Sequence, residues 1–461
     1  MQVILVIIAL VVAAFAGHLA GGGANVAPAL ALFAAFVSIL LAFLSPKTGL
    51  TVLVFAMLLS PEISLAGLSG TSRNVVIRYD DIILIVLFLS WFAKTAILKN
   101  KPLVFRSPVQ TPILLYTLVC VLSTAFAVMG GKVRWEVSIF YVLKYIEYFL
   151  LYFMTFNIIE DKEDVRRYLK YGAIVAAIVT VYAVWYYMSA GAGARATTPF
   201  EVPLGKPEES EPASLGGYYI LVFGLIFGVI SEMPVRTFAW SFAAMVAMMP
   251  AFVFTLSRSS YIGLAFSAAA AVLLSKKRKL FLIGALLVGV GALVLTPSLS
   301  EKARERVEIT YAGVYATNTF QTPFGEIRLE ESAAMRVRSW QRSVFYWLPK
   351  NILIGNGVTG TGLVDAQLPL VIGETGVIGF LLWIWMIYVC FKVAWRLYRG
   401  SQEPFVRSIA LGYIIGLIGL LFQSTGVNTF IIVRIMEPFW FLTAVVMKMA
   451  QMQEPAAKSS S

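Results

Sequence analysis

The chain has 461 residues, of which 59% are hydrophobic and 13% are charged, and its formal net charge is +12. Soluble domains are about half apolar and about a quarter charged, so this composition excludes an ordinary soluble protein. The positive charge does not indicate nucleic-acid binding, because most lysines and arginines stand at the ends of apolar runs, where they orient membrane helices.

Taken in chain order, the apolar runs predict an all-α polytopic integral membrane protein. The runs have about the 18–22 residues that cross a bilayer as a helix, and none alternates with the period of two expected for a membrane strand. We predict about 14 transmembrane helices, with a range of 12–14. They lie near residues 3–20, 26–44, 50–68, 82–98, 111–129, 138–158, 171–190, 215–232, 237–256, 260–275, 280–296, 367–395, 406–424 and 429–449.

Two of these runs need comment. The run at 1–20 resembles a signal peptide but lacks a basic segment before it, so we interpret it as a first transmembrane helix. The run at 50–68 is the least regular, because Pro61 and Glu62 interrupt it.

The number and positions of the histidine and cysteine residues argue against a metal site built from these residue types. His18 is the single histidine, so a cluster of histidine ligands is excluded. Cys120 and Cys390 lie inside apolar runs and are expected to be small core residues rather than a disulfide. We therefore expect no metal site and no cofactor.

Basic clusters set the predicted orientation. They follow the fourth, sixth, tenth and twelfth predicted helices and include Lys99, Arg166, the segment 275–279 ("SKKRK") and Arg396. All four connections are even-numbered, so the positive-inside rule predicts that they are cytoplasmic together with both chain termini. The connections 191–214 and 297–366 then face outward. The second is too long for a simple connection and begins with charges at helical spacing, so we expect it to be partly helical.

Arginines mark the expected outer face. Residues 335–342 read "MRVRSWQR", in which Arg338 and Arg342 would share a helix face beside Arg336. Guanidinium groups fit phosphate oxygens and repel one another unless an anion neutralises them. The alternative is a solvated basic face balanced by the nearby acids Glu326, Glu330 and Glu331.

Two further arginines fall in the same outer region. Arg258 ends an apolar run, where it would either face a partner or extend to the membrane interface. Arg195 is either a third ligand for an anion or an ordinary loop charge. Deeper in the chain, Arg434 and Glu437 are three residues apart in the last predicted helix, and we expect them to neutralise each other.

Three segments in this order resemble the shared core of the O-antigen ligase and O-antigen polymerase superfamily. They are "SRSSYIGLAFS" (257–267), "MRVRSWQRSVFYWLPKNILIGNGVTG" (335–360) and "DAQLPLVIGETGVIGFLLWI" (365–384). The motif positions of that family are held by Arg258, Arg336 with Trp340, Gly355 with Gly357, and Glu374 with Gly376 and Gly379.

The resemblance implies a glycosyltransferase of the bacterial inner membrane. It would transfer a glycan from undecaprenyl pyrophosphate to an acceptor saccharide, either another lipid-linked repeat or a lipid A core, and other polysaccharide-assembly proteins could be partners. It implies no nucleotide sugar and no obligatory metal. Combining the resemblance with the residue chemistry, we predict Asp365, Arg336 and Arg258 as catalytic residues and Arg338, Arg342, Arg195, Gly355, Gly357 and Glu374 as substrate-binding residues.

One position departs from the family pattern. Asp365 and Ala366 stand where the family has histidine and asparagine. A carboxylate can act as general base toward a sugar hydroxyl, and glycosyltransferases of the shape, elongation, division and sporulation family, which are similar in fold, are associated with an outer-loop aspartate. The alternative is that Asp365 only caps the following helix. The missing histidine slightly favours a polymerase over a ligase.

With this resemblance, the chain is predicted to have four segments. Residues 1–214 are N-terminal helices, 215–400 the ligase- or polymerase-like core, 401–450 the last helices and 451–461 a disordered tail.

A flippase or other polysaccharide transporter would carry charges near the membrane midplane in discontinuous helices of two repeated halves. A scaffold that binds anionic lipid would tolerate lysine in place of each arginine.

Overall fold

The fold is nearly all helical in the part of the chain that the structure describes. The computed structural model describes residues 37, 40, 41, 43, 45–64, 76–98, 107–191, 193–201, 211–285, 287, 318–322, 325–362 and 364–458. The predicted helix at 3–20, most of those at 26–44 and 280–296, and the charged segment 301–309 lie outside these residues.

The N-terminal part contains one short hairpin and eight helices among the described residues. Their bounds are α3 Pro46–Leu59, β1 Glu62–Ser64, β2 Val76–Arg78, α4 Tyr79–Leu98, α5 Gln110–Met129, α6 Trp135–Ile158, α7 Lys162–Ser189, α8 Pro212–Glu232, α9 Val235–Val253 and α10 Arg258–Leu274. The C-terminal part begins with a second hairpin. Its elements are β3 Asn318–Thr322, β4 Gly325–Leu329, α13 Glu331–Gln341, a π-helical turn Arg342–Trp347, a 3₁₀ turn Leu348–Lys350, α14 Gln367–Gly400, α15 Pro404–Gln423, a 3₁₀ turn Thr429–Ile431 and α16 Val433–Lys458.

Seven of the described helices are long and apolar enough to cross a membrane, namely α5 to α9, α14 and α15. Two shorter apolar helices, α3 and α10, accompany them. Within the described residues, most of the helices predicted from the apolar runs coincide with observed helices to within a few residues. A helical protein with several candidate membrane spans is therefore confirmed, whereas the total of about 14 stays a prediction.

Two predicted boundaries are wrong. The run at 50–68 is not one helix: α3 ends at Leu59, and after Ser60 and Pro61 the chain forms β1, which pairs antiparallel with β2. The tail is not disordered from residue 451, because α16 continues to Lys458. Gln453 in that extension donates a hydrogen bond of 2.7 Å to Ser401 Oγ, which ties it to the end of α14.

Glycines bring α8 and α15 into close contact. A Cβ atom on Gly228 would lie 2.1 Å from Ser408 O, and one on Gly224 would lie 2.6 Å from Gly416 N. Small residues of this kind let membrane helices approach at backbone distance. α10 joins the pair in the same way, since a Cβ on Gly263 would lie 2.8 Å from Gly419 O. The N-terminal end of α10 is thereby held against the chain that follows α15.

Charged connections meet at one end of these helices. Lys162 forms an ion pair with Glu403. Glu232, at the end of α8, accepts hydrogen bonds from Arg407 at 2.9 and 3.0 Å and forms an ion pair with Lys277 at 3.4 Å. The connections after α6, α10 and α14 therefore share one end, as the orientation rule predicts, while the side of the membrane that they face stays a prediction.

Candidate functional site

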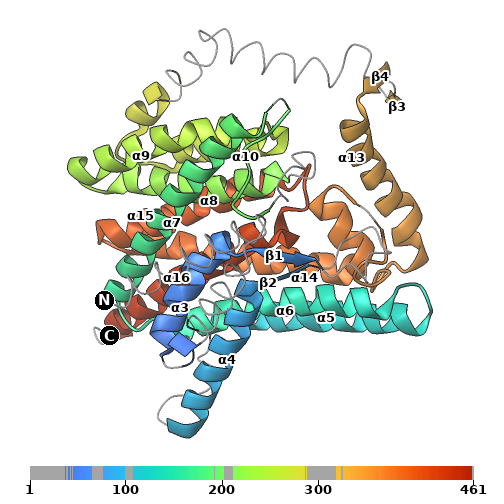
Figure 1. Cartoon of the computed structure of the whole chain (residues 1–461), viewed down its shortest axis with the longest axis horizontal. Coiled ribbons are helices and arrows are strands. Elements are labelled where there is room, and N and C mark those ends of the chain that lie inside the picture. The colour runs from blue at the N-terminus through green and yellow to red at the C-terminus, as the bar shows by residue number, and fades with distance from the viewer. Residues whose placement is uncertain are drawn as a thin grey trace, which may run out of the picture.

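The arginine-rich segment forms helix α13, which stands at one end of the bundle, across the direction of α5 and α6 (Figure 1). One face of the segment is buried through Ala334, Ser339 and Ser343, while Trp340 and Arg338 are exposed. This small-residue face lets α13 lie close against the bundle. Arg336 is half-buried, at the edge of that contact.

Arg336 packs beside the start of α10. A Cβ atom on Gly426, in the turn after α15, would lie 3.4 Å from Arg336 Nε and 2.7 Å from Ser259 Oγ. Only a glycine therefore leaves room for the Arg336 side chain between the turn and the helix. Arg258, the first residue of α10, forms an ion pair with Glu330, the residue before α13.

Electrostatics connect these groups to Asp365. Burial lowers the pKa of the Arg336 guanidinium from its ordinary value, and the charge of Arg258 lowers it further. The carboxylates of Asp365 and Glu330 act in the opposite direction. Two arginines and two acids thus influence one another at the same place.

The backbone holds Asp365 at this position. The Asp365 N–H donates a hydrogen bond of 3.1 Å to Ser339 Oγ on α13, and Asn428 Nδ2 donates to the carbonyl of the preceding Val364. The N-cap of α14 is Ala366, and no side chain caps it. The interpretation of Asp365 as the helix cap is therefore wrong, and its carboxylate is left to act on Arg336.

The other predicted arginines have different surroundings. Arg338 turns outward to the second hairpin, where it contacts Asn318 Oδ1 at 2.5 Å and Glu331 at 3.6 Å. The pairing of Arg338 with Glu331 matches part of the alternative given above, in which nearby acids balance a solvated basic face. Arg342 is exposed at the start of the π-helical turn. Arg195 is half-buried in the loop before α8, and the neighbouring Ala196 N–H donates to Phe254 O at 2.9 Å.

The glycine-rich loop is packed against α14. Gly376 breaks that helix with φ 66° and ψ −168°, and Gly355 of the loop has φ 73°. A Cβ on Gly355 would lie 2.4 Å from Glu374 O. The backbone that approaches this loop is therefore the protein's own. We predicted that the loop approaches substrate, and that role stays a prediction.

Glu374 and Gly357 belong to the same contact. The Gly357 N–H donates to Glu374 O at 2.9 Å and to Ser123 Oγ at 3.0 Å. The Glu374 carboxylate accepts a hydrogen bond of 2.8 Å from Thr359 N–H. These bonds hold the loop between α5 and α14. Glu374 and Gly357 therefore make contacts within the protein, and their predicted contact with substrate stays a prediction.

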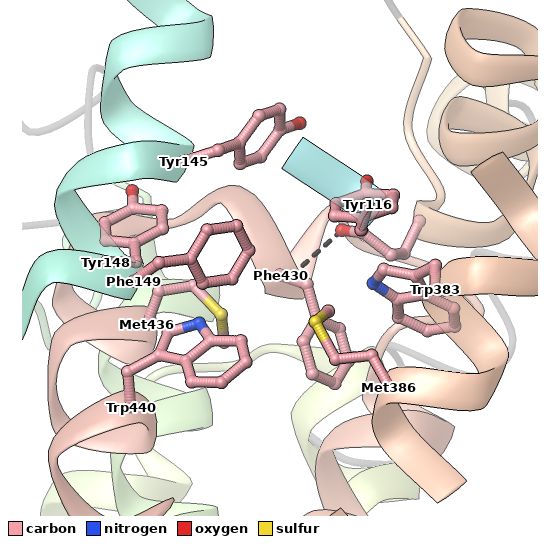
Figure 2. Close-up of a pocket in the computed structure, with 10 residues that line it drawn as sticks. Tyr116, Tyr145, Tyr148, Phe149, Trp383, Met386, Phe430, Met436 and Trp440 are labelled. Carbon is pink, nitrogen blue, oxygen red and sulfur yellow. Dashed lines mark hydrogen bonds between the residues drawn. The ribbon is translucent and has the colours of Figure 1, made fainter. Parts of the chain in front are cut away.

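An aromatic cavity lies next to the turn that follows α15. Its volume is about 20 Å³, room for about one water molecule, and Figure 2 shows aromatic and methionine side chains facing one another across it. The lining residues are Tyr116, Tyr145, Tyr148, Phe149, Gln367, Trp383, Met386, Phe430, Met436 and Trp440. Gln367 Oε1 accepts a hydrogen bond of 2.9 Å from Phe430 N–H.

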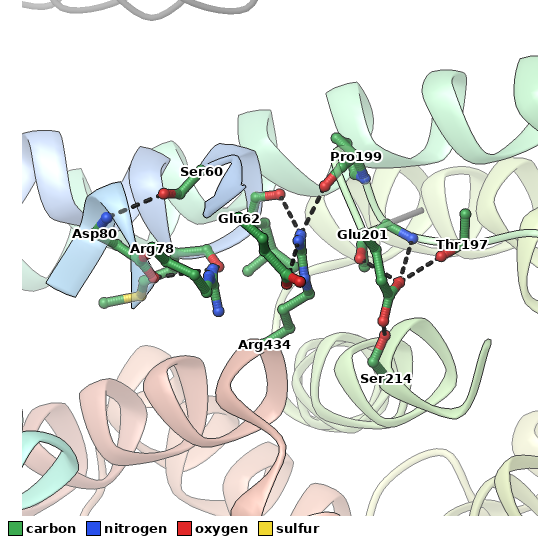
Figure 3. Close-up of polar contacts among 12 residues, drawn as sticks. Ser60, Glu62, Arg78, Asp80, Thr197, Pro199, Glu201, Ser214 and Arg434 are labelled. Atoms are coloured by element: carbon green, nitrogen blue, oxygen red, sulfur yellow. Dashed lines mark hydrogen bonds and ion pairs between the residues drawn. The ribbon is translucent and has the colours of Figure 1, made fainter. Parts of the chain in front are cut away.

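The sequence interpretation did not find the partners of the buried charges near the starts of α4 and α16. The expected pair of Arg434 and Glu437 is wrong: Arg434 instead binds Glu62 at 2.9 Å and donates to Pro199 O at 2.7 Å (Figure 3). Arg78 forms an ion pair of 2.9 Å with Asp80. The signal was present as charged residues inside or at the edge of apolar runs, which usually have a partner in the fold.

No family model matches the chain, and no curated protein matches it at a significant level. The resemblance to the O-antigen ligase and polymerase superfamily therefore stays a prediction from the quoted motifs.

Proposed function

We propose that the protein is a membrane glycosyltransferase that takes a glycan from undecaprenyl pyrophosphate and joins it to an acceptor saccharide on the extracytoplasmic face. The single observation that carries the proposal is the meeting of Arg258, Arg336 and Asp365 at one end of the bundle. These residues come from three separate segments of the chain. Arginines favour a bidentate anion such as a phosphate, and a carboxylate beside them can accept a proton.

The proposed reaction uses each of the three groups. Asp365 accepts the proton of an acceptor hydroxyl, whose oxygen forms a bond to the anomeric carbon of the donor glycan. The bond from that carbon to the pyrophosphate oxygen breaks, and the electron pair leaves with the lipid pyrophosphate. Arg336 and Arg258 stabilise the negative charge that develops there.

Glu330 has a defined part in this proposal. It pairs with Arg258 in the structure, with its own side chain only 13% exposed. A pyrophosphate must therefore compete with Glu330 for the guanidinium. Exchange of one anionic partner for another would keep Arg258 from remaining an unpaired, partly buried charge between turnovers.

The test is transfer by the purified full chain in lipid, with a synthetic undecaprenyl-pyrophosphate oligosaccharide as donor and chromatographic measurement of released lipid pyrophosphate. Arg336→Lys and Asp365→Asn are expected to reduce turnover by about 100-fold or more, because a bidentate contact or the base is lost. Arg338→Lys is the matched control, because this side chain points to the hairpin.

The alternatives predict different results. A lipid-binding scaffold would show no transfer in the wild type and would keep its lipid affinity in Arg336→Lys. An acceptor that carries a lipid-linked repeat and lengthens into a ladder identifies a polymerase, whereas transfer only to a lipid A core identifies a ligase. Equal transfer by Arg336→Lys, Arg338→Lys and the wild type would remove the arginine cluster from the mechanism.

A transporter is the second candidate, and two observations favour it. α14 is discontinuous at Gly376, and charged side chains such as Lys144 are buried within apolar helices. Discontinuous helices and buried charges line the substrate sites of many transporters. Proteoliposomes that contain fluorescent lipid-linked glycan would distinguish the two functions: a flippase moves the lipid between leaflets without any acceptor, and a glycosyltransferase does not.

A further inference from the structure

Three buried carboxylates from two distant segments meet where α4 and α16 begin. Asp80 and Asp81 stand in the first turn of α4, and Glu437 stands near the start of α16. One oxygen atom of each lies within 4.8 Å of those of the other two. Asp80 and Glu437 are 0% exposed and Asp81 is 7% exposed. Like charges at such distances repel strongly away from water, so something must balance them.

The neighbouring cations balance only part of this charge. Arg78 pairs with Asp80 at 2.9 Å, and Lys144 pairs with Asp81 at 2.5 Å. Lys144 also pairs with Glu147 at 3.0 Å, a fourth carboxylate whose side chain is 13% exposed. Among the described residues, four acids therefore surround two cations, which leaves two negative charges in excess. Arg434 does not reduce the excess, because it is paired with Glu62.

Glu437 is the acid of this group for which the described residues show no ion pair, although the charges of Asp80 and Arg78 act on it. Within the described part of the chain, neither of its two buried carboxylate oxygens has a hydrogen-bond partner. An ionised carboxylate held in this way costs several kcal/mol or more unless a positive charge compensates it. Protons shared within the two acid pairs, Glu437 with Asp80 and Glu147 with Asp81, are the alternative to a bound cation, and the binding test below distinguishes the two.

We propose that Asp80, Asp81 and Glu437 bind a divalent cation. All the ligand atoms are carboxylate oxygens, which suit hard cations such as Ca²⁺ and Mg²⁺. Oxygen atoms around Ca²⁺ lie about 2.3–2.6 Å from the ion, so they can be up to about 5 Å apart, whereas the shorter bonds of Mg²⁺ allow only about 4 Å. The three carboxylate oxygens all lie within 4.8 Å of one another, which Ca²⁺ accommodates without any movement, so Ca²⁺ is the ion used in the test.

The ion would join α4, α6 and α16 next to the aromatic cavity. Lys144 and Glu147 of α6 flank Tyr145 and Tyr148, which line that cavity, and Met436 precedes Glu437. A cation here would neutralise the excess charge and fix the wall of the cavity. This inference departs from the sequence expectation of no metal site, and it does not depend on the proposed glycosyl transfer.

The test is Ca²⁺ binding to the full chain in lipid nanodiscs after removal of metals with EDTA. Isothermal titration calorimetry is expected to give one Ca²⁺ per chain, and the unfolding temperature is expected to rise with Ca²⁺ concentration and reach a plateau. Glu437→Gln keeps the size of the side chain and removes its charge, so it is expected to weaken Ca²⁺ binding about 10-fold or more. Asp80→Asn is expected to act in the same direction.

Glu136→Gln is the matched control, because Glu136 is a half-exposed acid in the first turn of α6. It is expected to bind Ca²⁺ like the wild type. If the wild type binds neither Ca²⁺ nor Mg²⁺ at millimolar concentration, the proposal is overturned and the carboxylates are neutralised by protons. Equal Ca²⁺ affinity in Glu437→Gln and the wild type would overturn it as well. Should Glu437→Gln fail to fold, the titration of the wild type decides alone.

Discussion

Arg434 shows how a single buried guanidinium connects distant segments of this protein. Its side chain is 3% exposed and reaches Glu62 at 2.9 Å, Pro199 O at 2.7 Å and Leu58 O at 3.3 Å. It thereby ties α16 to the end of α3, to the first hairpin and to the loop before α8. The guanidinium reaches these three segments with donors on two different nitrogen atoms, whereas the three donors of a lysine all lie on one nitrogen.

We predict that Arg434→Met lowers the free energy of unfolding by about 3–5 kcal/mol, because Glu62 and two carbonyl oxygens lose their donor. The unfolding temperature in detergent measures the effect. A double substitution with Glu62→Gln should recover part of the loss, since the uncompensated carboxylate is then removed as well. Loss of the same size in the single and double variants would show that packing rather than charge gives Arg434 its effect.

At the scale of elements, the break in α14 is the feature on which the glycine-rich loop depends. Gly376 has φ 66° and ψ −168°, a combination that side chains hardly tolerate. The break frees backbone groups that the loop then satisfies, since Val377 N–H donates to Ile352 O at 2.9 Å and Ile378 N–H donates to Leu353 O at 3.1 Å. The short helix before the break begins next to Asp365.

Gly376→Ala is therefore expected to lower the free energy of unfolding by more than about 2 kcal/mol. A Cβ atom there would also lie 2.4 Å from Leu353 O, which is backbone and cannot move aside alone. Gly172→Ala is the control, because Gly172 lies inside α7 and a Cβ on it meets nothing within 4 Å. That change should leave stability unchanged or raise it by about 0.5–1 kcal/mol. Equal stability of the two variants in a thermal melt would contradict the strain at Gly376.

Sequence patterns predicted where the helices lie better than they predicted which residues contact one another. Apolar runs are sufficient to locate α5 or α15, because a membrane span needs about 20 apolar residues whatever it packs against. The end of α3 at Leu59 was not predicted, although Pro61 and Glu62 marked that run as irregular, and the pairing of β1 with β2 needs contacts that periodicity does not encode. Arg434 was expected to pair with Glu437 because the two are close in sequence, whereas its partner is Glu62.

The candidate site illustrates the same limit. Motif order was enough to select Arg258, Arg336 and Asp365, whose charges act on one another in the structure, while their role as a site stays a prediction. It did not reveal that Glu330 pairs with Arg258, or that Gly426 makes the room for Arg336. Both facts depend on how α13 docks on the bundle, which is a three-dimensional property. The acids around Glu437 were equally invisible, because they come from α4, α6 and α16.

For the molecule as a whole, the two ends of the bundle carry different chemistry. One end holds paired charges from the predicted cytoplasmic connections, such as Glu403 with Lys162 and Glu232 with Arg407. The other holds Arg258, Arg336 and Asp365. An enzyme acting on lipid-linked glycan outside the cell needs the second end to face outward, so orientation is a condition of the proposed function.

Cysteine labelling in intact cells tests that orientation. Gln341 at the end of α13 and Gln402 between α14 and α15 are both exposed, and each can be replaced by cysteine. The native Cys120 and Cys390 are 1% and 0% exposed, so they should give little background. A membrane-impermeant maleimide is expected to label Gln341→Cys in intact spheroplasts and Gln402→Cys only after the membrane is opened. The reverse pattern would place the arginine cluster in the cytoplasm, where an extracytoplasmic glycosyltransferase could not use it.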